Sequence, residues 1–540
     1  MRVHTSVPLA LALAGALLLT GCGGGAEARK VDPPTVGAGG ARNAGAGGTF
    51  VKEGVFGGAN GMRARVEIMG VERLGAKSVL RYNVTSLESA KKSVTFAIDL
   101  LDPVGRLLYR PTGSTSGENF EPGATREMAA EYTAIPQNVA KVTAITPGTA
   151  GEFTGIPVTG TADPSAASLA RLRGNPIELY DLVEGKIRDV ESSPHQVKIR
   201  LHADALFTGR SAKLSGRAGA LLDETAQEIK TKAMRPLTIV GHTDGRGDDS
   251  DNLKLSEERA EAVMKAMKSR LGGDFTYTTS GKGEAEPVAE EGGEDDAKAR
   301  ARNARVEIAY QVKRPADAVP NPPGGPSANP PGGPSASTPG GPPATAPGGP
   351  SAPAPGVPSA ESDDGVSVRP PADPLAKSPS PLTGQPSATP GSPPGGASPN
   401  GVPAEFRAED GEKVASREAG KRRLDVKPFY RDGSYIVAVF DIVGEGPTPA
   451  TYTHRDYPGG VFTSFSIRVK GSDDVHRAVR IGPVSPGADG SYLDPGRAVP
   501  DAGADQPVRG FVYLPAPPGN ATTVTFDAGP FGTVEDVPVQ

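Results

Sequence analysis

The sequence predicts a multi-domain protein in which a central two-layer α/β domain is flanked by two β-sandwich modules. Short apolar runs separated by Gly, Pro and Asp fill residues 51–160 and 424–540, a pattern typical of sandwiches. Strand-type and helix-type periods alternate between residues 175 and 313. A tract rich in proline and glycine, residues 315–415, separates the central domain from the last module.

The first residues have the composition of an export signal. A basic start at Arg2 is followed by an apolar run from Val7 to Leu19, which is too short to span a bilayer. Leu19-Thr20-Gly21-Cys22 then resembles the lipobox of bacterial lipoproteins. The resemblance implies a signal peptide over residues 1–21 and a mature protein whose first residue, Cys22, is thioether-linked to diacylglycerol. The alternative is an ordinary secretory signal peptide that is cleaved near the same point.

Composition sets limits on the mature chain. Cys22 is the only cysteine among 540 residues, so an intrachain disulfide is excluded and no thiol remains for catalysis. A net charge of −5, with no basic patch between aromatic residues, argues against nucleic-acid binding. Residues 22–50 are mostly small or polar and predict a flexible tether. In the tract 315–415, Pro-Gly recurs every eight residues from Pro323 to Pro355, which predicts a disordered spacer.

The two outer regions resemble each other. Val79–Val84 in the first and Tyr435–Phe440 in the last are strand-type runs. Both regions end in a similar way, because Ile135-Pro136 and Leu514-Pro515 each precede a further apolar run. The sequence therefore predicts two copies of one immunoglobulin-like module. Neither copy contains a cluster of His, Asp or Glu that suggests a site.

The central region alternates between strand and helix periods. Apolar spacing predicts a helix from Leu214 to Ile229 and another from Ala260 to Leu271, the second closed by Gly272-Gly273. Strands are expected at residues 197–201, 237–240, 277–281 and 305–310. Strands that run parallel need crossover connections, which the two helices supply.

A motif follows the strand at 237–240. Its residues are Gly241-His242-Thr243-Asp244, Gly247, Asn252, Leu255-Ser256 and Arg259-Ala260. This spacing closely resembles the signature of OmpA-like peptidoglycan-binding domains, the family that includes the C-terminal domains of OmpA and MotB. Gly281-Lys282-Gly283-Glu284 and Asn303-Ala304-Arg305 also resemble the family, although a second arginine is usual at the position of Ala304.

The resemblance implies a ligand and a binding site. The ligand is the diaminopimelate side chain of a peptidoglycan stem peptide, whose free end is a zwitterion. Asp244 is then expected to bind its ammonium group and Arg259 its carboxylate, which suits the planar guanidinium. Thr243 belongs to the same motif, Asn252 is expected to fix the loop, and Leu255 to pack against the aliphatic part of the peptide. Backbone N–H groups near residues 205–208 and near the start of the helix are expected to complete carboxylate binding.

Other interpretations of these residues remain open. Asp244 and Arg259 also fit a structural ion pair on a solvated surface. His242 has no second His or Cys at ligand spacing, which favours a packed histidine over a metal ligand. The run Asp248–Asp251 lacks the spaced ligands and distal Glu of a calcium loop. We therefore expect no metal and no cofactor. The effect of Ala304 on affinity stays open.

These observations predict a lipid-anchored, non-enzymatic envelope protein that tethers a membrane to peptidoglycan. Its expected partners are the membrane, through Cys22, and diaminopimelate-containing peptidoglycan. Its expected location is the extracytoplasmic face of the cell membrane, or the outer membrane in a diderm. The alternative is an envelope adaptor whose β modules bind a protein partner, with peptidoglycan binding serving only to position the adaptor at the wall. A wall hydrolase is disfavoured, because the sequence offers no convincing Ser-His-Asp set, zinc motif or carboxylate pair.

Overall fold

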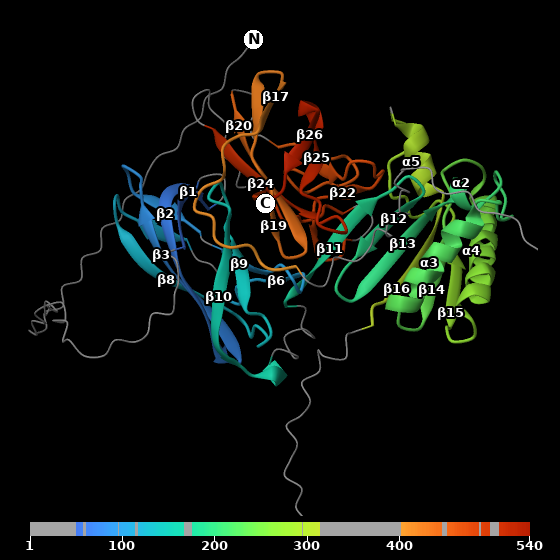
Figure 1. Ribbon diagram of the computed structural model, residues 1–540, viewed down its shortest axis with the longest axis horizontal. Helices are drawn as coiled ribbons and strands as arrows, with labels where there is room; N and C mark the ends of the chain where they lie inside the picture. The colour runs from blue at the N-terminus through green and yellow to red at the C-terminus, as the bar shows by residue number, and fades with distance from the viewer. Residues whose placement is uncertain are drawn as a thin grey trace, which may run out of the picture. The chain divides into compact units, whose positions relative to one another are not determined.

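The computed structural model describes ten stretches of the chain, all within one compact unit from Thr49 to Gln540 (Figure 1). They are residues 50–57, 61–95, 97–113, 117–166, 175–293, 295–313, 401–444, 451–484, 488–496 and 507–540. The predicted signal peptide, Cys22, nearly all of the tether and most of the 315–415 linker lie outside these residues. The described chain is mostly β-structure in several sheets, with its helices in the central region.

The N-terminal region, residues 50–162, is built from β-strands. They are β1 (Phe50–Phe56), β2 (Met62–Gly75), β3 (Lys77–Ser86), β4 (Lys92–Val94), β5 (Asp99–Asp102), β6 (Leu107–Tyr109), β7 (Glu118–Phe120), β8 (Thr125–Thr133), β9 (Lys141–Ile145) and β10 (Glu152–Ala162). β2 pairs antiparallel with β1 and β3, and parallel with β10. Alternate residues of β2, from Met62 to Ile68, are buried in one apolar cluster, as the period of two predicts.

The central region carries the strands β12 (Arg188–Ser192), β13 (Gln196–His202), β14 (Leu237–Gly241), β15 (Tyr277–Gly281) and β16 (Arg305–Gln311). β16 lies between β13 and β14 and is antiparallel to both, while β15 pairs parallel with β14. β13 pairs with β12 on its other side. The last strand in sequence is therefore inserted in the middle of the sheet, which sequence periodicity does not reveal.

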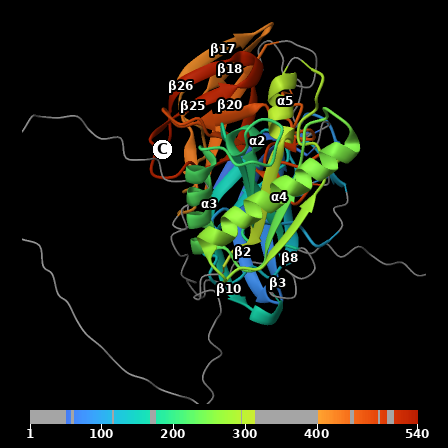
Figure 2. The same ribbon diagram turned by 90° about the vertical axis from the view of Figure 1, so that its right-hand side faces the viewer.

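Four helices accompany this sheet: α2 (Ala203–Leu206), α3 (Ala218–Lys232), α4 (Asp249–Leu271) and α5 (Asp296–Asn303). α3 and α4 face the viewer in Figure 2, and α4 packs on β14 and β15. This packing is close: a Cβ on Gly241 would overlap the Ser256 carbonyl oxygen, and one on Gly281 would overlap the Ser256 hydroxyl. The glycines at the ends of β14 and β15 therefore let α4 approach the strands.

The C-terminal region is again built from strands. They are β17 (Ala415–Ala419), β18 (Arg422–Val426), β19 (Tyr430–Asp432), β20 (Tyr435–Val443), β21 (Phe465–Arg468), β22 (Val475–Arg477), β23 (Arg480–Ile481), β24 (Val508–Pro515), β25 (Thr523–Ala528) and β26 (Thr533–Pro538), with a short 3₁₀ helix, η3 (Gly529–Phe531). β20 pairs with β18, β19 and β24, and its inward residues join an apolar cluster rich in phenylalanine.

The structure differs from the predicted boundary between the linker and the last region. Residues 401–415 were expected in the linker, but Phe406 packs against the rings of Phe50 and Phe153, at 5.1 and 6.1 Å between centroids. β17 then begins at Ala415, before the expected start at 424. Composition averaged over a window hides a single buried aromatic residue, which is why the sequence places this boundary too late.

One strand joins the three regions. β11 (Ile177–Glu184) pairs with β12 of the central region, with β22 and β23 of the C-terminal region, and with β6 of the N-terminal region. A shared apolar cluster contains Leu108, Leu179 and Phe511, one from each region. The sequence pattern predicts separate modules and gives no sign of this connection.

Candidate functional site

Asp244 lies just beyond the end of β14, at the start of the loop that leads to α4. Its side chain is 6% exposed. One carboxylate oxygen accepts a hydrogen bond from Arg210 Nη1 at 3.2 Å, and the other accepts from Arg246 Nε at 2.9 Å. A buried carboxylate needs such partners to offset its lost hydration. The Arg210 and Arg246 side chains are 45% and 62% exposed, so an incoming ammonium group can exchange with them in solvent.

Asn252 holds this loop from the first turn of α4 and is fully buried. Its Nδ2 donates to the Arg246 carbonyl at 3.1 Å and to Glu284 Oε2 at 2.6 Å. Its Oδ1 accepts from Arg210 Nη2 at 2.9 Å. Asn252 thus links both arginine partners of Asp244 to the helix.

Arg259 lies on α4 two turns after Asn252 and on the same face of the helix. It is 4% exposed. Its Nε donates to the Ser211 carbonyl at 3.1 Å and its Nη2 to the Gly209 carbonyl at 3.3 Å. Its guanidinium lies 5.1 Å from the centre of the Phe207 ring. Its contacts are thus neutral groups rather than a carboxylate, unlike those of the other arginines around Asp244.

The electrostatic environment of Arg259 favours an anionic ligand. Burial, and then the neighbouring Arg210 charge, lower the pKa of Arg259 from its usual value. An arginine nevertheless stays protonated at neutral pH. The positive charge of Arg259 is therefore held in a partly desolvated environment, where it would bind a carboxylate more strongly than in water.

Asp244 and Arg259 line one cavity of about 460 Å³, which we call the Asp244 cavity. Its lining residues are Ala203, Asp204, Phe207, Gly209, Arg210, Thr243, Asp244, Arg246, Leu255, Arg259, Ala297, Arg300, Ala301 and Ala304. Four of the five residues that the sequence proposed for binding are in this set. The fifth, Asn252, is not a lining residue but contacts two residues that are, Arg210 and Arg246.

Thr243 lines the Asp244 cavity and also carries an unusual buried polar atom. The residue is 3% exposed, and its Oγ1 is buried without a hydrogen-bond partner among the described residues. A buried hydroxyl that lacks a partner costs about 1–3 kcal/mol. Such a cost at a cavity wall is offset when a ligand supplies the missing partner.

Two of the backbone N–H groups expected to bind a carboxylate, those of Phe207 and Thr208, are already engaged. The Phe207 N–H donates to the Ala203 carbonyl at 2.8 Å, and the Thr208 N–H donates to the Lys213 carbonyl at 3.0 Å. The expectation was wrong for these two groups, because the chain turns at once after the four-residue helix α2. In their place the structure brings Arg210 from the same loop into the cavity wall.

Three arginines that line the cavity were missed by the sequence reasoning: Arg210, Arg246 and Arg300. Arg246 lies two residues after the Gly-His-Thr-Asp motif and Arg210 three residues after Phe207, so their closeness to recognised parts of the motif was an available signal. Arg300 offered none, because α5 was not predicted. Ala304, which stands where the family usually has arginine, also lines the cavity, one helical turn after Arg300.

The polar residues outside the cavity have structural roles. His242 is 1% exposed with no hydrogen-bond partner for its ring nitrogens among the described residues, and burial, then Arg305, lowers its pKa to about 4. This environment suits a neutral, packed imidazole. Asp249 and Asp251 lie in the first turn of α4, where negative charge favours the helix. In the part of the chain described, no three His, Cys, Asp or Glu side chains gather as a metal site would require.

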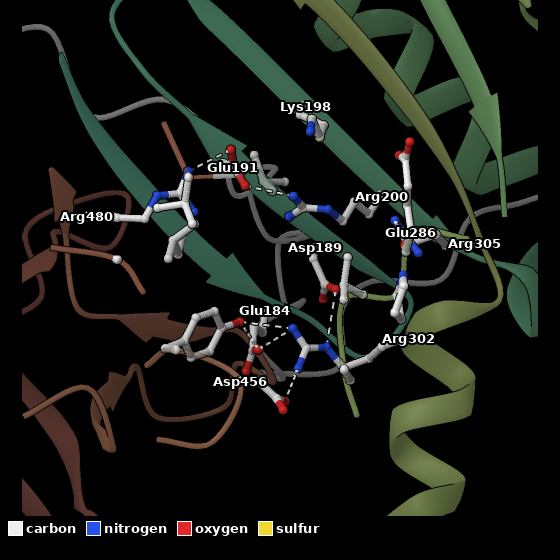
Figure 3. Close-up of a pocket in the computed structure, with 18 of the residues that line it drawn as sticks. Glu184, Asp189, Glu191, Lys198, Arg200, Glu286, Arg302, Arg305, Asp456 and Arg480 are labelled. Carbon is white, nitrogen blue, oxygen red and sulfur yellow. Dashed lines mark hydrogen bonds and ion pairs between the residues drawn. The ribbon is translucent and has the colours of Figure 1, made fainter. Parts of the chain in front are cut away.

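A second and slightly larger cavity, of about 490 Å³, lies beside the other side of α5 (Figure 3). We call it the Glu184 cavity. Its charged side chains are largely paired with one another, as Arg302 is with Glu184 and Asp456, and Arg480 is with Glu191. Charges that already neutralise each other make this cavity a weaker candidate for a ligand than the Asp244 cavity.

Membrane attachment is not visible in the described part of the chain. None of its helices combines the length and the apolar character that a transmembrane span requires. Cys22, the expected lipidation site, lies outside it.

Comparison with known protein families matches the region of the chain that contains the sequence motif. Residues 206–302 match the model of the OmpA family. Outer membrane protein A of Bordetella avium is 34% identical over 116 residues, which are 22% of this chain and 58% of that protein. The probable lipoprotein YiaD of Escherichia coli is 28% identical over 136 residues, 24% of this chain and 61% of that protein. The chain thus covers less than two thirds of either relative.

A solved structure with a similar sequence is the peptidoglycan-associated lipoprotein from Burkholderia pseudomallei, which is 32% identical. The match covers 20% of this chain and 88% of that one, with a TM-score of 0.17. Each of these matches covers about a quarter of the chain or less. The residues matched by the family model, 206–302, include most of the residues that line the Asp244 cavity. Residues 206–302 of this chain form an OmpA-family domain.

Proposed function

We propose that the OmpA-like domain binds peptidoglycan non-covalently, through the diaminopimelate of a stem peptide in the Asp244 cavity. The observation that carries the proposal is that a buried carboxylate, Asp244, and a buried guanidinium, Arg259, line the same cavity. Asp244 can accept the ligand ammonium, and Arg259, whose contacts are neutral groups, can take the carboxylate as a fork. Thr243 supplies a hydroxyl that lacks a partner, and Leu255 an apolar surface.

The relatives support this proposal at the level of the cell envelope. Their printed names describe an outer membrane protein, a lipoprotein and a peptidoglycan-associated lipoprotein, and none names an enzyme. We infer that this chain likewise acts by binding and connects a membrane to the cell wall. The membrane end would be the lipid on Cys22, at the extracytoplasmic face. Replacing Cys22 with Ser should move the protein out of the membrane fraction, and unchanged fractionation would contradict the anchor.

The domain organisation belongs to the same proposal. We infer a two-layer α/β domain over residues 175–313 from the packing of α4 on β14 and β15. Immunoglobulin-like modules on either side are favoured by the antiparallel ladders around β2 and β20 and by their separate apolar clusters. A tether at residues 22–50, between the lipid-anchored Cys22 and the first strand, would let the folded body reach the wall.

A pull-down with purified sacculi tests the binding site. Asp244→Ala and Arg259→Ala should each lose binding, because either change leaves one charge of the zwitterion unpaired in a partly desolvated site, at a cost of about 2–5 kcal/mol. Arg259→Lys should restore binding only in part, since an ammonium keeps the charge but not the fork. Asp251→Ala, an exposed change on α4, is the matched control. Folded Asp244→Ala and Arg259→Ala proteins that bind sacculi like the wild type would refute the proposal.

A further inference from the structure

A short segment of the C-terminal region, residues 455–457, contacts two parts of the OmpA-like domain that adjoin the Asp244 cavity. One is α5 and the other is the loop of residues 288–291. We propose that Asp456 and Tyr457, with help from Arg455, are positioning residues for the Asp244 cavity. They hold α5 and this loop in the arrangement that the ligand requires. The proposal rests on the proposed function, since it concerns the same cavity.

The main contact is made by Arg302 of α5. Its Nη1 lies 2.7 Å from Asp456 Oδ2, its Nη2 donates to the Tyr457 hydroxyl at 2.9 Å, and Nη2 also lies 2.9 Å from Glu184 Oε1 (Figure 3). The Arg302 and Asp456 side chains are 10% and 14% exposed. Arg477 pairs with the same Glu184 at 2.7 Å. A buried network of this kind is geometrically specific, and removing one member leaves a buried charge unpaired.

The cavity lies along a different face of the same helix. Ala297, Arg300, Ala301 and Ala304 line the Asp244 cavity and recur every three or four residues, which is one helical face. Arg302 is one residue beyond Ala301 and therefore points about 100° around the axis. α5 thus separates the Asp244 cavity from the Glu184 cavity, and its position sets one wall of each.

α5 needs such contacts to keep its place. It has eight residues, and a helix this short is not stable on its own in water. Its only large buried side chain is that of Arg302, because the other buried residues are Ala299 and Asn303. The network around Arg302 is therefore a major constraint on where α5 lies.

The second contact reaches the Asp244 side of the cavity through the loop of residues 288–291. Asn303, at the end of α5, holds this loop: its Oδ1 accepts from the Val288 and Ala289 N–H groups at 2.8 and 3.0 Å. Glu291 then accepts from the N–H of Gly245, the residue after Asp244, at 3.2 Å. Arg455 donates to the Glu290 carbonyl in the same loop. The Arg455 side chain is about half exposed, so we assign it the smaller part.

The test measures the affinity of the full mature chain for a soluble muropeptide that ends in diaminopimelate, by calorimetry. Asp456→Asn and Tyr457→Phe should weaken binding by about fivefold or more, the size of a typical coupling between sites. Hydrogen exchange in α5 should become faster in the same variants. Asp456→Glu keeps the carboxylate and should recover most of the affinity. Tyr457→Phe removes only one hydroxyl, so it remains informative if Asp456→Asn fails to fold.

Arg480→Ala is the matched control. It removes a similarly buried pair of the Glu184 cavity, Arg480 with Glu191 at 2.9 Å, but Glu191 belongs to β12, which does not line the Asp244 cavity. Its muropeptide affinity should stay within about twofold of the wild type. Equal weakening by Arg480→Ala, or an unchanged affinity in folded Tyr457→Phe and Asp456→Asn, would overturn the proposal. A wild-type chain that binds neither muropeptide nor sacculi would instead refute the proposed function.

Discussion

Replacing Asn252 with Ala should loosen the loop that carries Asp244, and the structure allows the cost to be worked out. The change removes one neutral hydrogen bond of good length, to the Arg246 carbonyl, and two bonds with charged partners, Arg210 and Glu284. A further contact, to the Asp244 carbonyl at 3.5 Å, is too long to add much. A neutral bond contributes about 1 kcal/mol and one to a charged group about 1.5–3 kcal/mol, so the sum is about 4–7 kcal/mol. Two effects reduce this sum. Arg210 is about half exposed and regains hydrogen bonds to water, and Ala favours the helix over Asn by about 0.5 kcal/mol. A net loss of about 2–4 kcal/mol in local stability remains.

Hydrogen exchange of the amides in residues 244–252 measures this loss directly, because it reports local opening in the full chain. Asn252→Asp should also be destabilised, since it keeps the acceptor for Arg210 but sets a carboxylate against Glu284, whose oxygen lies 2.6 Å from Asn252 Nδ2. Asp251→Ala, exposed on the same helix turn, serves as the control and should change little. A loss below about 0.5 kcal/mol in Asn252→Ala would refute the view that this residue fixes the loop.

Two further predictions concern the neighbouring motif residues. Thr243→Val should raise stability by about 1 kcal/mol, because it removes a buried hydroxyl without a partner, while it weakens muropeptide binding in calorimetry. Lower stability with unchanged affinity would contradict this. The pKa of His242 is lowered to about 4 in the folded chain, whereas an unfolded histidine has a pKa of about 6.5. As the pH drops, the unfolded chain therefore binds the proton before the folded chain does. The free energy of unfolding should fall by about 3 kcal/mol between about pH 6.5 and about pH 4. Urea titrations of wild type and His242→Gln at pH 7 and pH 4 should show a loss that is larger in the wild type by about this amount, since the buried His476 contributes equally to both proteins. Parallel pH profiles of the two proteins would count against the prediction.

The motif of the OmpA-like domain could be read from the sequence because its spacing encodes local geometry. Asn252, Leu255 and Arg259 follow each other at three and four residues, so a helix places them on one face. Gly241 and Gly281 were recognisable as motif glycines. The structure explains why glycine is needed there, because Ser256 approaches both positions too closely for a side chain. Four of the five proposed binding residues accordingly line one cavity.

Residues without a periodic signal were the ones that sequence reasoning missed. α5 is short and mostly polar, so it shows no apolar stripe, and with it Arg300 and Arg302 escaped notice. Arg210 lies in an irregular loop whose path depends on tertiary packing. The acidic run Asp248–Asp251 lacks the spacing of a calcium loop, and in the structure Asp249 begins helix α4.

The sequence by itself determined the kind of domain at the centre of this chain and the residues that its motif brings together, since both depend on contacts between near neighbours. Only the tertiary structure decided how the regions join. β11 pairs with strands on either side of it in sequence, and Arg302 meets Asp456 across 154 positions. Such contacts depend on which surfaces meet when the chain folds, and neither hydrophobic period nor residue spacing encodes that choice.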